Sequence, residues 1–134
     1  APTSSFFEDQ YSHGKGIYNF IQSTFPNKKL TELNVLEIGC GAGGILYFFK
    51  KQGCTVMGLD LGDEYLQFGR DKYGLNLKQG SLNSKLDFTP DIVIYSHVME
   101  HVLDLEFELL KLKDVNALKE KAPASGLYLY KVKY

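Results

Sequence analysis

One ten-residue segment constrains the fold of this chain more than any other: VLEIGCGAGG, residues 35–44. A short apolar run containing one acid predicts a buried parallel strand, and the glycines after it predict a tight turn into a helix. Gly39 can adopt the positive φ of such a turn, and Gly41 lets the main chain approach a ligand. Gly43 or Gly44 permits close helix packing, and the helix start would offer N–H groups to an anionic group. The alternative is an ordinary turn, but four glycines in six residues weaken a turn unless something must come close.

Two ligand classes fit this loop. The spacing Gly39-x-Gly41-x-x-Gly44 matches the phosphate-binding pattern of dinucleotide folds, with Asp60 placed to hold a ribose. A dinucleotide fold usually has six strands, however, and 134 residues leave room for about five. The second pattern, Glu37-x-Gly39-x-Gly41-x-Gly43, fits the same segment and includes the acid.

Residues 37–43 resemble motif I of the class I S-adenosylmethionine-dependent methyltransferases. The resemblance covers roughly residues 33–132 and continues, in the family's order, through GLD at 58–60, QGSL at 79–82 and DIVIYSHVMEHV at 91–102. The last stretch is similar to the small-molecule subgroup that includes ubiquinone-biosynthesis-type enzymes. The charge of Glu37 favours the same choice, because a carboxylate would repel a pyrophosphate but attract the α-ammonium of a methionine moiety. The alternative is that Glu37 only accepts N–H bonds from the loop.

Periodicity and boundary residues predict alternating helices and strands. Helices are expected over residues 6–25, 43–52, 63–73 and 104–119, and strands over 33–38, 55–59, 75–79, 91–95 and 127–132. This alternation implies a mostly parallel sheet. The resemblance implies a Rossmann-like α/β fold with strand order 3-2-1-4-5. It also implies that the chain lacks the family's last two strands and is a fragment or a minimal form. Strand 127–132 would then be an exposed edge open to self-association.

The predicted site lies beyond the carboxyl ends of the strands, at the switch point between strands one and four. There Asp60 would accept two hydrogen bonds from a ribose diol, and Leu61 would pack on the adenine, although a core leucine fits as well. Ser81 stands where many relatives carry an acid, and its hydroxyl or the N–H of Leu82 could contact the adenine. The predicted cofactor-binding residues are Glu37, Gly39, Cys40, Gly41, Gly43, Asp60, Leu61, Ser81, Leu82 and Ser96.

Two histidines are the candidate catalytic bases. Methyl transfer from a sulfonium needs the acceptor held in line, and needs a base only if the acceptor arrives protonated. His97 follows strand four directly and His101 comes one helical turn later, so either could serve, and either could simply shape the pocket. The stretch 97–101 also matches the H-x-x-E-H zinc motif, but it abuts an apolar strand instead of lying within a helix, so no metal is expected.

Composition limits the partners. The length fits one domain, divided into an N-terminal helical cap (1–30) and a Rossmann-like core (31–134). Fifteen basic and sixteen acidic residues show no basic stripe, so nucleic acid is not an expected partner. No segment approaches the roughly 20 apolar residues of a membrane span, and the start resembles no leader peptide. Cys40 and Cys54 fall at opposite ends of neighbouring strands, so free thiols and a reducing, cytoplasmic location are expected.

The sequence therefore predicts methyl transfer from S-adenosylmethionine to a small-molecule acceptor on oxygen, nitrogen or carbon. Two other functions stay open. One is a non-catalytic cofactor-binding or scaffold domain, and the other is an NAD-dependent oxidoreductase.

Overall fold

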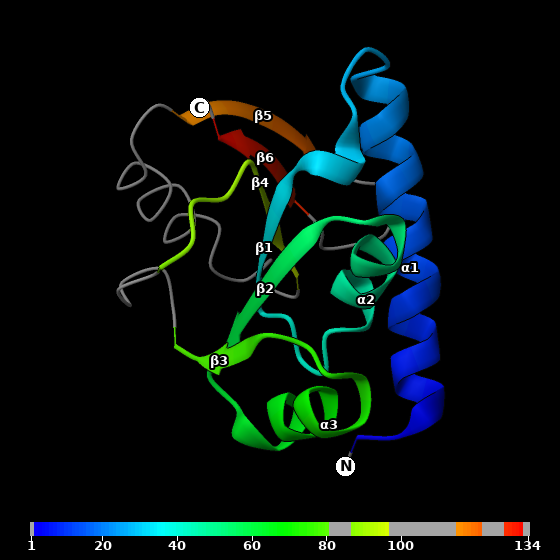
Figure 1. Cartoon of the computed structure of the whole chain (residues 1–134), viewed down its shortest axis with the longest axis vertical. Helices are drawn as coiled ribbons and strands as arrows, with labels where there is room; N and C mark the ends of the chain where they lie inside the picture. The colour runs from blue at the N-terminus through cyan, green and yellow to red at the C-terminus, as the bar shows by residue number, and fades with distance from the viewer. Residues whose placement is uncertain (1, 81–86, 97–114, 122–127, 133–134) are drawn as a thin grey trace.

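The computed structural model describes residues 2–80, 87–96, 115–121 and 128–132 (Figure 1). Its helices are α1 (Ser4–Thr24), α2 (Gly44–Gln52) and α3 (Asp63–Tyr73), with a short 3₁₀ helix at Leu30–Glu32. Its strands are β1 (Asn34–Ile38), β2 (Thr55–Asp60), β3 (Leu77–Gln79), β4 (Ile92–Tyr95), β5 (Val115–Lys121) and β6 (Tyr128–Val132). Up to residue 95, every described α-helix and strand was predicted and lies within a few residues of its predicted bounds, whereas the 3₁₀ helix was not predicted.

The strands form one sheet in the order β3-β2-β1-β4-β6-β5. The four strands β3, β2, β1 and β4 are parallel to one another, with Glu37 opposite Gly58 on one side and Ile94 on the other. The chain leaves β1 towards β2 on one side and enters β4 on the other, so the switch point lies between β1 and β4. The predicted Rossmann-like α/β class and the strand order 3-2-1-4 are confirmed.

The C-terminal part corrects two predictions. Residues 115–119, predicted as the end of a helix, belong to strand β5. The segment predicted as an exposed parallel fifth strand is β6, which runs antiparallel to β4 and is covered on its other side by β5. Only residues 122–127 separate β5 from β6, and so short a connection permits an antiparallel hairpin but not a parallel crossover. The edge on which self-association was predicted is therefore already paired.

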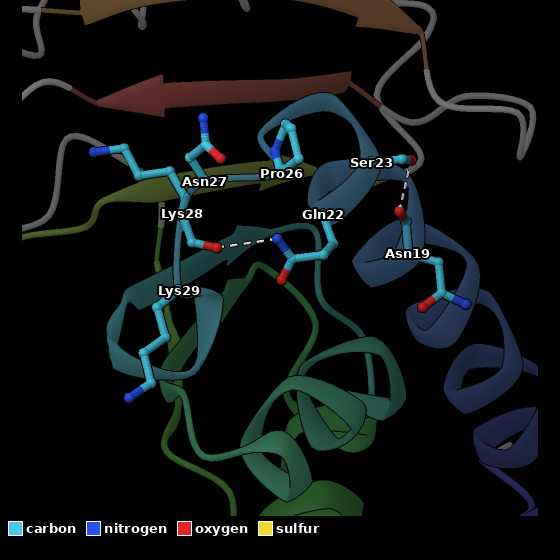
Figure 2. Close-up of a pocket in the computed structure, with 7 residues that line it drawn as sticks. All are labelled: Asn19, Gln22, Ser23, Pro26, Asn27, Lys28 and Lys29. Atoms are coloured by element: carbon cyan, nitrogen blue, oxygen red, sulfur yellow. Dashed lines mark hydrogen bonds between the residues drawn. The ribbon is translucent and has the colours of Figure 1, made fainter.

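Helix α1 connects to β1 through a turn at the amino-terminal edge of the parallel strands. Pro26 follows the helix, as predicted for its end, and the Gln22 amide donates to the carbonyls of Phe25 (3.2 Å) and Lys28 (3.0 Å). An open hollow of about 610 Å³ lies on this turn (Figure 2). Its lining residues are Asn19, Gln22, Ser23, Pro26, Asn27, Lys28 and Lys29. None belongs to the glycine loop, which lies at the opposite end of β1.

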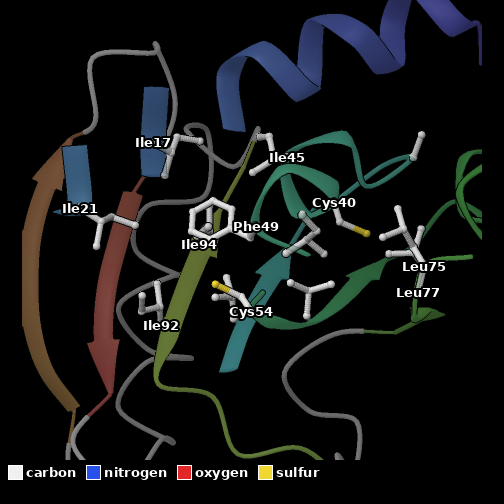
Figure 3. Packing of buried hydrophobic residues seen from close by; sticks show 14 of the residues in the cluster. Ile17, Ile21, Cys40, Ile45, Phe49, Cys54, Leu75, Leu77, Ile92 and Ile94 are labelled. Carbon is white, nitrogen blue, oxygen red and sulfur yellow. The ribbon is translucent and has the colours of Figure 1, made fainter. Parts of the chain in front are cut away.

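The three helices cover one face of the sheet. Side chains of α1, α2 and α3 share a single buried cluster with residues of β1, β2, β3 and β4, and Figure 3 shows it extending from Ile21 at one side to Leu77 at the other. The intervening strand residues, including Leu36, Met57 and Val93, are buried as well. Strands buried on both faces explain the near-continuous apolar runs in the sequence.

Close backbone approaches and stacked rings hold α1 against the rest of the molecule. A Cβ at Gly14 would lie 2.7 Å from the Ile45 carbonyl oxygen, and one at Gly44 would lie 2.6 Å from the Phe7 carbonyl oxygen. The Phe7 ring stacks on Tyr73 with centroids 3.6 Å apart. Gly44, which was predicted to let α2 approach the sheet, instead provides space for α1.

The boundaries of α2 follow the sequence signals. Gly53 ends the helix at φ 110°, and Lys50 and Lys51 occupy its last turn, next to the negative end of its dipole. Helix α3 differs slightly, because Gly62 holds its N-cap position and the predicted cap, Asp63, lies in the first turn. The two cysteines are free and buried.

Candidate functional site

The loop between β1 and α2 is built on three glycines with positive φ, which are Gly39 (77°), Gly41 (56°) and Gly43 (83°). A Cβ at Gly39 would lie 2.4 Å from the Ser96 carbonyl oxygen, so this position brings the loop against the end of β4. Gly43 is the left-handed N-cap of α2 and faces Leu75 and Leu77. The positive φ predicted for Gly39 is confirmed, and the conformation explains why larger residues are disfavoured at all three positions.

Backbone bonds tie this loop to the end of β2. The Leu59 carbonyl oxygen accepts from the N–H groups of Gly39 (2.8 Å) and Cys40 (3.1 Å). The N–H of Gly43 donates to the Cys40 carbonyl at 2.9 Å and closes the turn. The loop is therefore held at both of its ends by the protein itself.

Asp60 links two loops at the carboxyl end of β2. Its Oδ2 accepts from the Gly41 N–H at 2.8 Å, and its Oδ1 accepts from the Gly62 N–H at 3.1 Å. Each carboxylate oxygen has two lone pairs, so one acceptor position remains on each. The structure thus assigns Asp60 a bracing role that the sequence did not reveal, and leaves room for the predicted ribose contact.

Glu37 lies under the loop and is fully buried, with 0% of its surface exposed. Its Oε2 accepts a 2.5 Å hydrogen bond from the Ser96 hydroxyl, whereas Oε1 has no hydrogen-bond partner among the described residues. The pKa of Glu37 is raised to about 8, chiefly by burial, with the Ser96 hydroxyl lowering it and Asp60 raising it. A buried acid with one unpaired oxygen suits a cationic partner, so the residues present fit an ammonium-bearing ligand.

Gln10, which was not among the predicted site residues, reaches the same loop from α1. Its side-chain Nε2 donates to the Cys40 carbonyl at 3.3 Å, and its Oε1 accepts from the Gly44 N–H at 3.1 Å. The first N–H of α2, predicted to be open to an anion, is therefore bound within the protein. The buried stripe of α1 consists of Phe7, Gln10, Gly14, Ile17 and Ile21, so the available signal was a polar residue at core spacing.

The other predicted residues fall in three groups. Cys40 is buried in the core, its N–H and carbonyl are hydrogen-bonded, and burial raises the pKa of its thiol far above the usual range. Leu61 is 75% exposed beside the loop, so its side chain is free to contact a ligand. Ser81, Leu82, His97 and His101 lie outside the described residues, and their roles stay predictions. No metal-binding group of three or more His, Cys, Asp or Glu side chains is found within the described segments.

Residues 6–122 match a family model described as a methyltransferase domain. The chain belongs to this methyltransferase family. The match includes α1 together with the four parallel strands, so the helix that carries Gln10 falls within the family domain.

Curated relatives and solved structures agree with this assignment. The mitochondrial ubiquinone biosynthesis O-methyltransferase of Homo sapiens is 31% identical over 93 residues, which cover 60% of this chain and 25% of that protein. Streptomyces venezuelae DesVI is 25% identical and matches with a TM-score of 0.55, over 67% of this chain and 38% of DesVI. The plantazolicin methyltransferase BpumL, solved with SAH and a desmethylPZN analog, shares the fold at 20% identity, with a TM-score of 0.61 over 84% of this chain and 48% of BpumL.

The methyltransferase domain spans between 25% and 42% of the lengths of the curated relatives it matches. None of the helices within the described ranges is long and apolar enough to cross a membrane.

Proposed function

We propose that this methyltransferase domain binds S-adenosylmethionine at the glycine loop and transfers its methyl group to a small-molecule acceptor. The observation that carries the proposal is the buried Glu37 carboxyl, with its unpaired Oε1, under a loop of positive-φ glycines at the switch point of the sheet. The names of the relatives, ubiquinone biosynthesis O-methyltransferase among them, describe those proteins and guide the choice of acceptors to test here.

Each described residue has a distinct part in this proposal. Glu37 holds the α-ammonium of the methionine moiety, and Asp60 accepts from the ribose diol while bracing the loop. Leu61 covers the adenine face, and the backbone at Gly41 lets the methionine moiety lie close to the main chain. The remaining predicted contacts are Gly39, Cys40, Gly43, Ser81, Leu82 and Ser96.

When bound, the cofactor supplies a methyl group already activated by a positive sulfur, so the protein chiefly has to position the acceptor and exclude water. His97 is the proposed base for an acceptor that arrives protonated, with His101 as the second candidate. Both follow the Ser96 end of β4 in the sequence. The cytoplasmic location is also part of this proposal, and the two free buried thiols support it because they suit a reducing compartment.

A titration of the protein with S-adenosylhomocysteine and, separately, with NAD tests the ligand class. We expect S-adenosylhomocysteine to bind at least about tenfold more tightly, because its ammonium favours the ionised form of Glu37, whereas a pyrophosphate has no cation to pair with that carboxylate. Tighter binding of NAD would refute the proposal. Turnover with methyl-labelled cofactor and a panel of phenols, amines and activated carbon acids then separates a catalyst from a non-catalytic cofactor-binding domain.

A further inference from the structure

Gln10 is the one buried polar side chain that α1 contributes within the described segments, and only 5% of its surface is exposed. Its two hydrogen bonds go to opposite sides of the glycine turn. The Nε2 donates to the carbonyl of Cys40, just after β1, and the Oε1 accepts from the N–H of Gly44, the first residue of α2. One planar amide therefore spans the turn and sets the separation of its two ends.

The same amide lies directly over the middle of the loop. A Cβ placed on Gly41 would meet Gln10 Nε2 at 3.2 Å, and no described side chain comes closer to that position. On the other side of Gly41, its N–H is held by Asp60. The centre of the loop is thus bonded to Asp60 of β2 and lies against the Gln10 amide of α1.

The packing of α1 fixes where this amide lies. Gly44 allows the Gln10 Cβ to approach so closely that a Cβ on Gly44 would be 2.4 Å from it. Phe7, one turn earlier on α1, stacks on Tyr73 and contacts Tyr47 of α2. Because these contacts involve backbone, the buried Phe7 ring and two partly buried tyrosine rings, the position of the amide relative to the loop is set by the docking of the whole helix.

We infer that Gln10 is a positioning residue, and that α1 forms part of the cofactor site by holding the glycine loop in its binding conformation. This inference rests on the proposed function. A loop rich in glycine has many accessible conformations, so removal of one brace lowers the fraction of molecules in which the loop is correctly shaped. The apparent dissociation constant rises by the same factor as that fraction falls.

A purely structural role for Gln10 predicts a different result. If Gln10 only satisfies buried backbone groups, its replacement should destabilise the protein but leave the affinity of the folded fraction unchanged. The chain offers a matched control in Gln22, which lies on the same helix and also bonds to backbone carbonyls, but at the far end from the loop.

The experiment compares Gln10→Met with Gln22→Met, since methionine keeps the length of the side chain and removes its hydrogen bonds. S-adenosylhomocysteine affinity is measured by calorimetry below the unfolding transition of each variant. We expect the dissociation constant to rise about tenfold for Gln10→Met and to change less than about twofold for Gln22→Met. If Gln10→Met does not fold, Gln10→Glu and Gln22→Glu replace the pair, with the same ordering expected.

Equal affinity in the Gln10 and Gln22 variants, with binding by the wild type retained, would overturn the positioning role and leave the proposed function standing. Failure of the wild-type protein to bind S-adenosylhomocysteine would overturn both.

Discussion

A carboxyl group lies at or near the end of each of β1 and β2, but the two groups differ in how many of their oxygens accept hydrogen bonds. At the end of β2, both oxygens of Asp60 accept hydrogen bonds from loop N–H groups, and the residue is only partly buried. Near the end of β1, Glu37 is completely buried, receives one hydrogen bond from Ser96, and keeps one oxygen unpaired among the described residues. Asp60 therefore serves the fold in the free protein, whereas Glu37 keeps one oxygen for the ammonium contact that we propose.

This difference explains why the two acids should respond differently to substitution. A residue that braces a loop contributes to stability with or without a ligand. A buried acid with an unpaired oxygen costs stability until a cationic partner arrives. Affinity and stability measured on the same variants should therefore separate the two roles.

The largest expected effect is on affinity at Glu37. Glu37→Gln keeps the shape and removes the charge that would pair with an ammonium, so S-adenosylhomocysteine affinity should fall about hundredfold, as for other buried charge pairs that lose one partner. Thermal stability at neutral pH should stay the same or rise, because the carboxyl in the free protein is already mostly protonated. Calorimetry and thermal unfolding followed by circular dichroism test this, and an unchanged affinity would contradict the ammonium contact.

Asp60→Ala should lower stability more, and affinity less, than Glu37→Gln does. It leaves the N–H groups of Gly41 and Gly62 without their acceptor, so unfolding free energy should fall by roughly 1–3 kcal/mol. Affinity should fall about tenfold through the loss of the ribose contact and the looser loop. Asp60→Asn is the control, since its amide oxygen can still accept one of the two bonds. A variant with wild-type stability would show that Asp60 does not brace the loop.

The pH dependence of stability sharpens the comparison. The pKa of Glu37 is about 8 in the folded protein and near its ordinary value of 4.5 in the unfolded chain, so between these values the native state holds a proton that the unfolded chain has released. The contribution of Glu37 to unfolding free energy should therefore decrease as pH rises from about 4.5 to about 8. Glu37→Gln should remove this slope, which is measured as the difference between wild type and variant in urea unfolding at several pH values.

The smallest expected effect is at Ser96. Its hydroxyl donates to Glu37 and lowers the pKa of that carboxyl, so Ser96→Ala should raise the pKa further. If the ionised carboxyl binds the ammonium, affinity at pH 7 should fall several-fold, and part of the loss should be recovered at pH 8.5, where more of the acid is ionised. Titrations at both pH values test this, and a loss of equal size at the two would show that Ser96 acts by another route.

The sequence was sufficient where local rules control the outcome. The segment from Val35 to Gly44 predicted strand, turn and helix correctly, because apolar residues favour a buried strand and glycine alone tolerates the three positive φ angles that follow. Glu37 and Asp60 were also identified from spacing. Their different surroundings were not, since burial and hydrogen-bond partners depend on β4, α1 and the loop after β2, which are distant in the chain.

The same dependence on distant partners explains why the sequence predicted neither strand β5 nor the contacts of Gln10. Residues 115–119 continue a helical pattern, but pairing with β6 makes them a strand, because strand formation depends on a partner that no local window contains. Gln10 was visible only as a polar residue in an apolar stripe. Its contact with Cys40 and Gly44 exists because α1 docks on α2 through Gly14, Gly44 and a stack of aromatic rings. The sequence by itself determined the conformation of the glycine loop. Only the tertiary structure decided which side chains hold the loop in place, because Gln10 and its partners in the loop are about thirty residues apart in the chain and meet only when α1 docks.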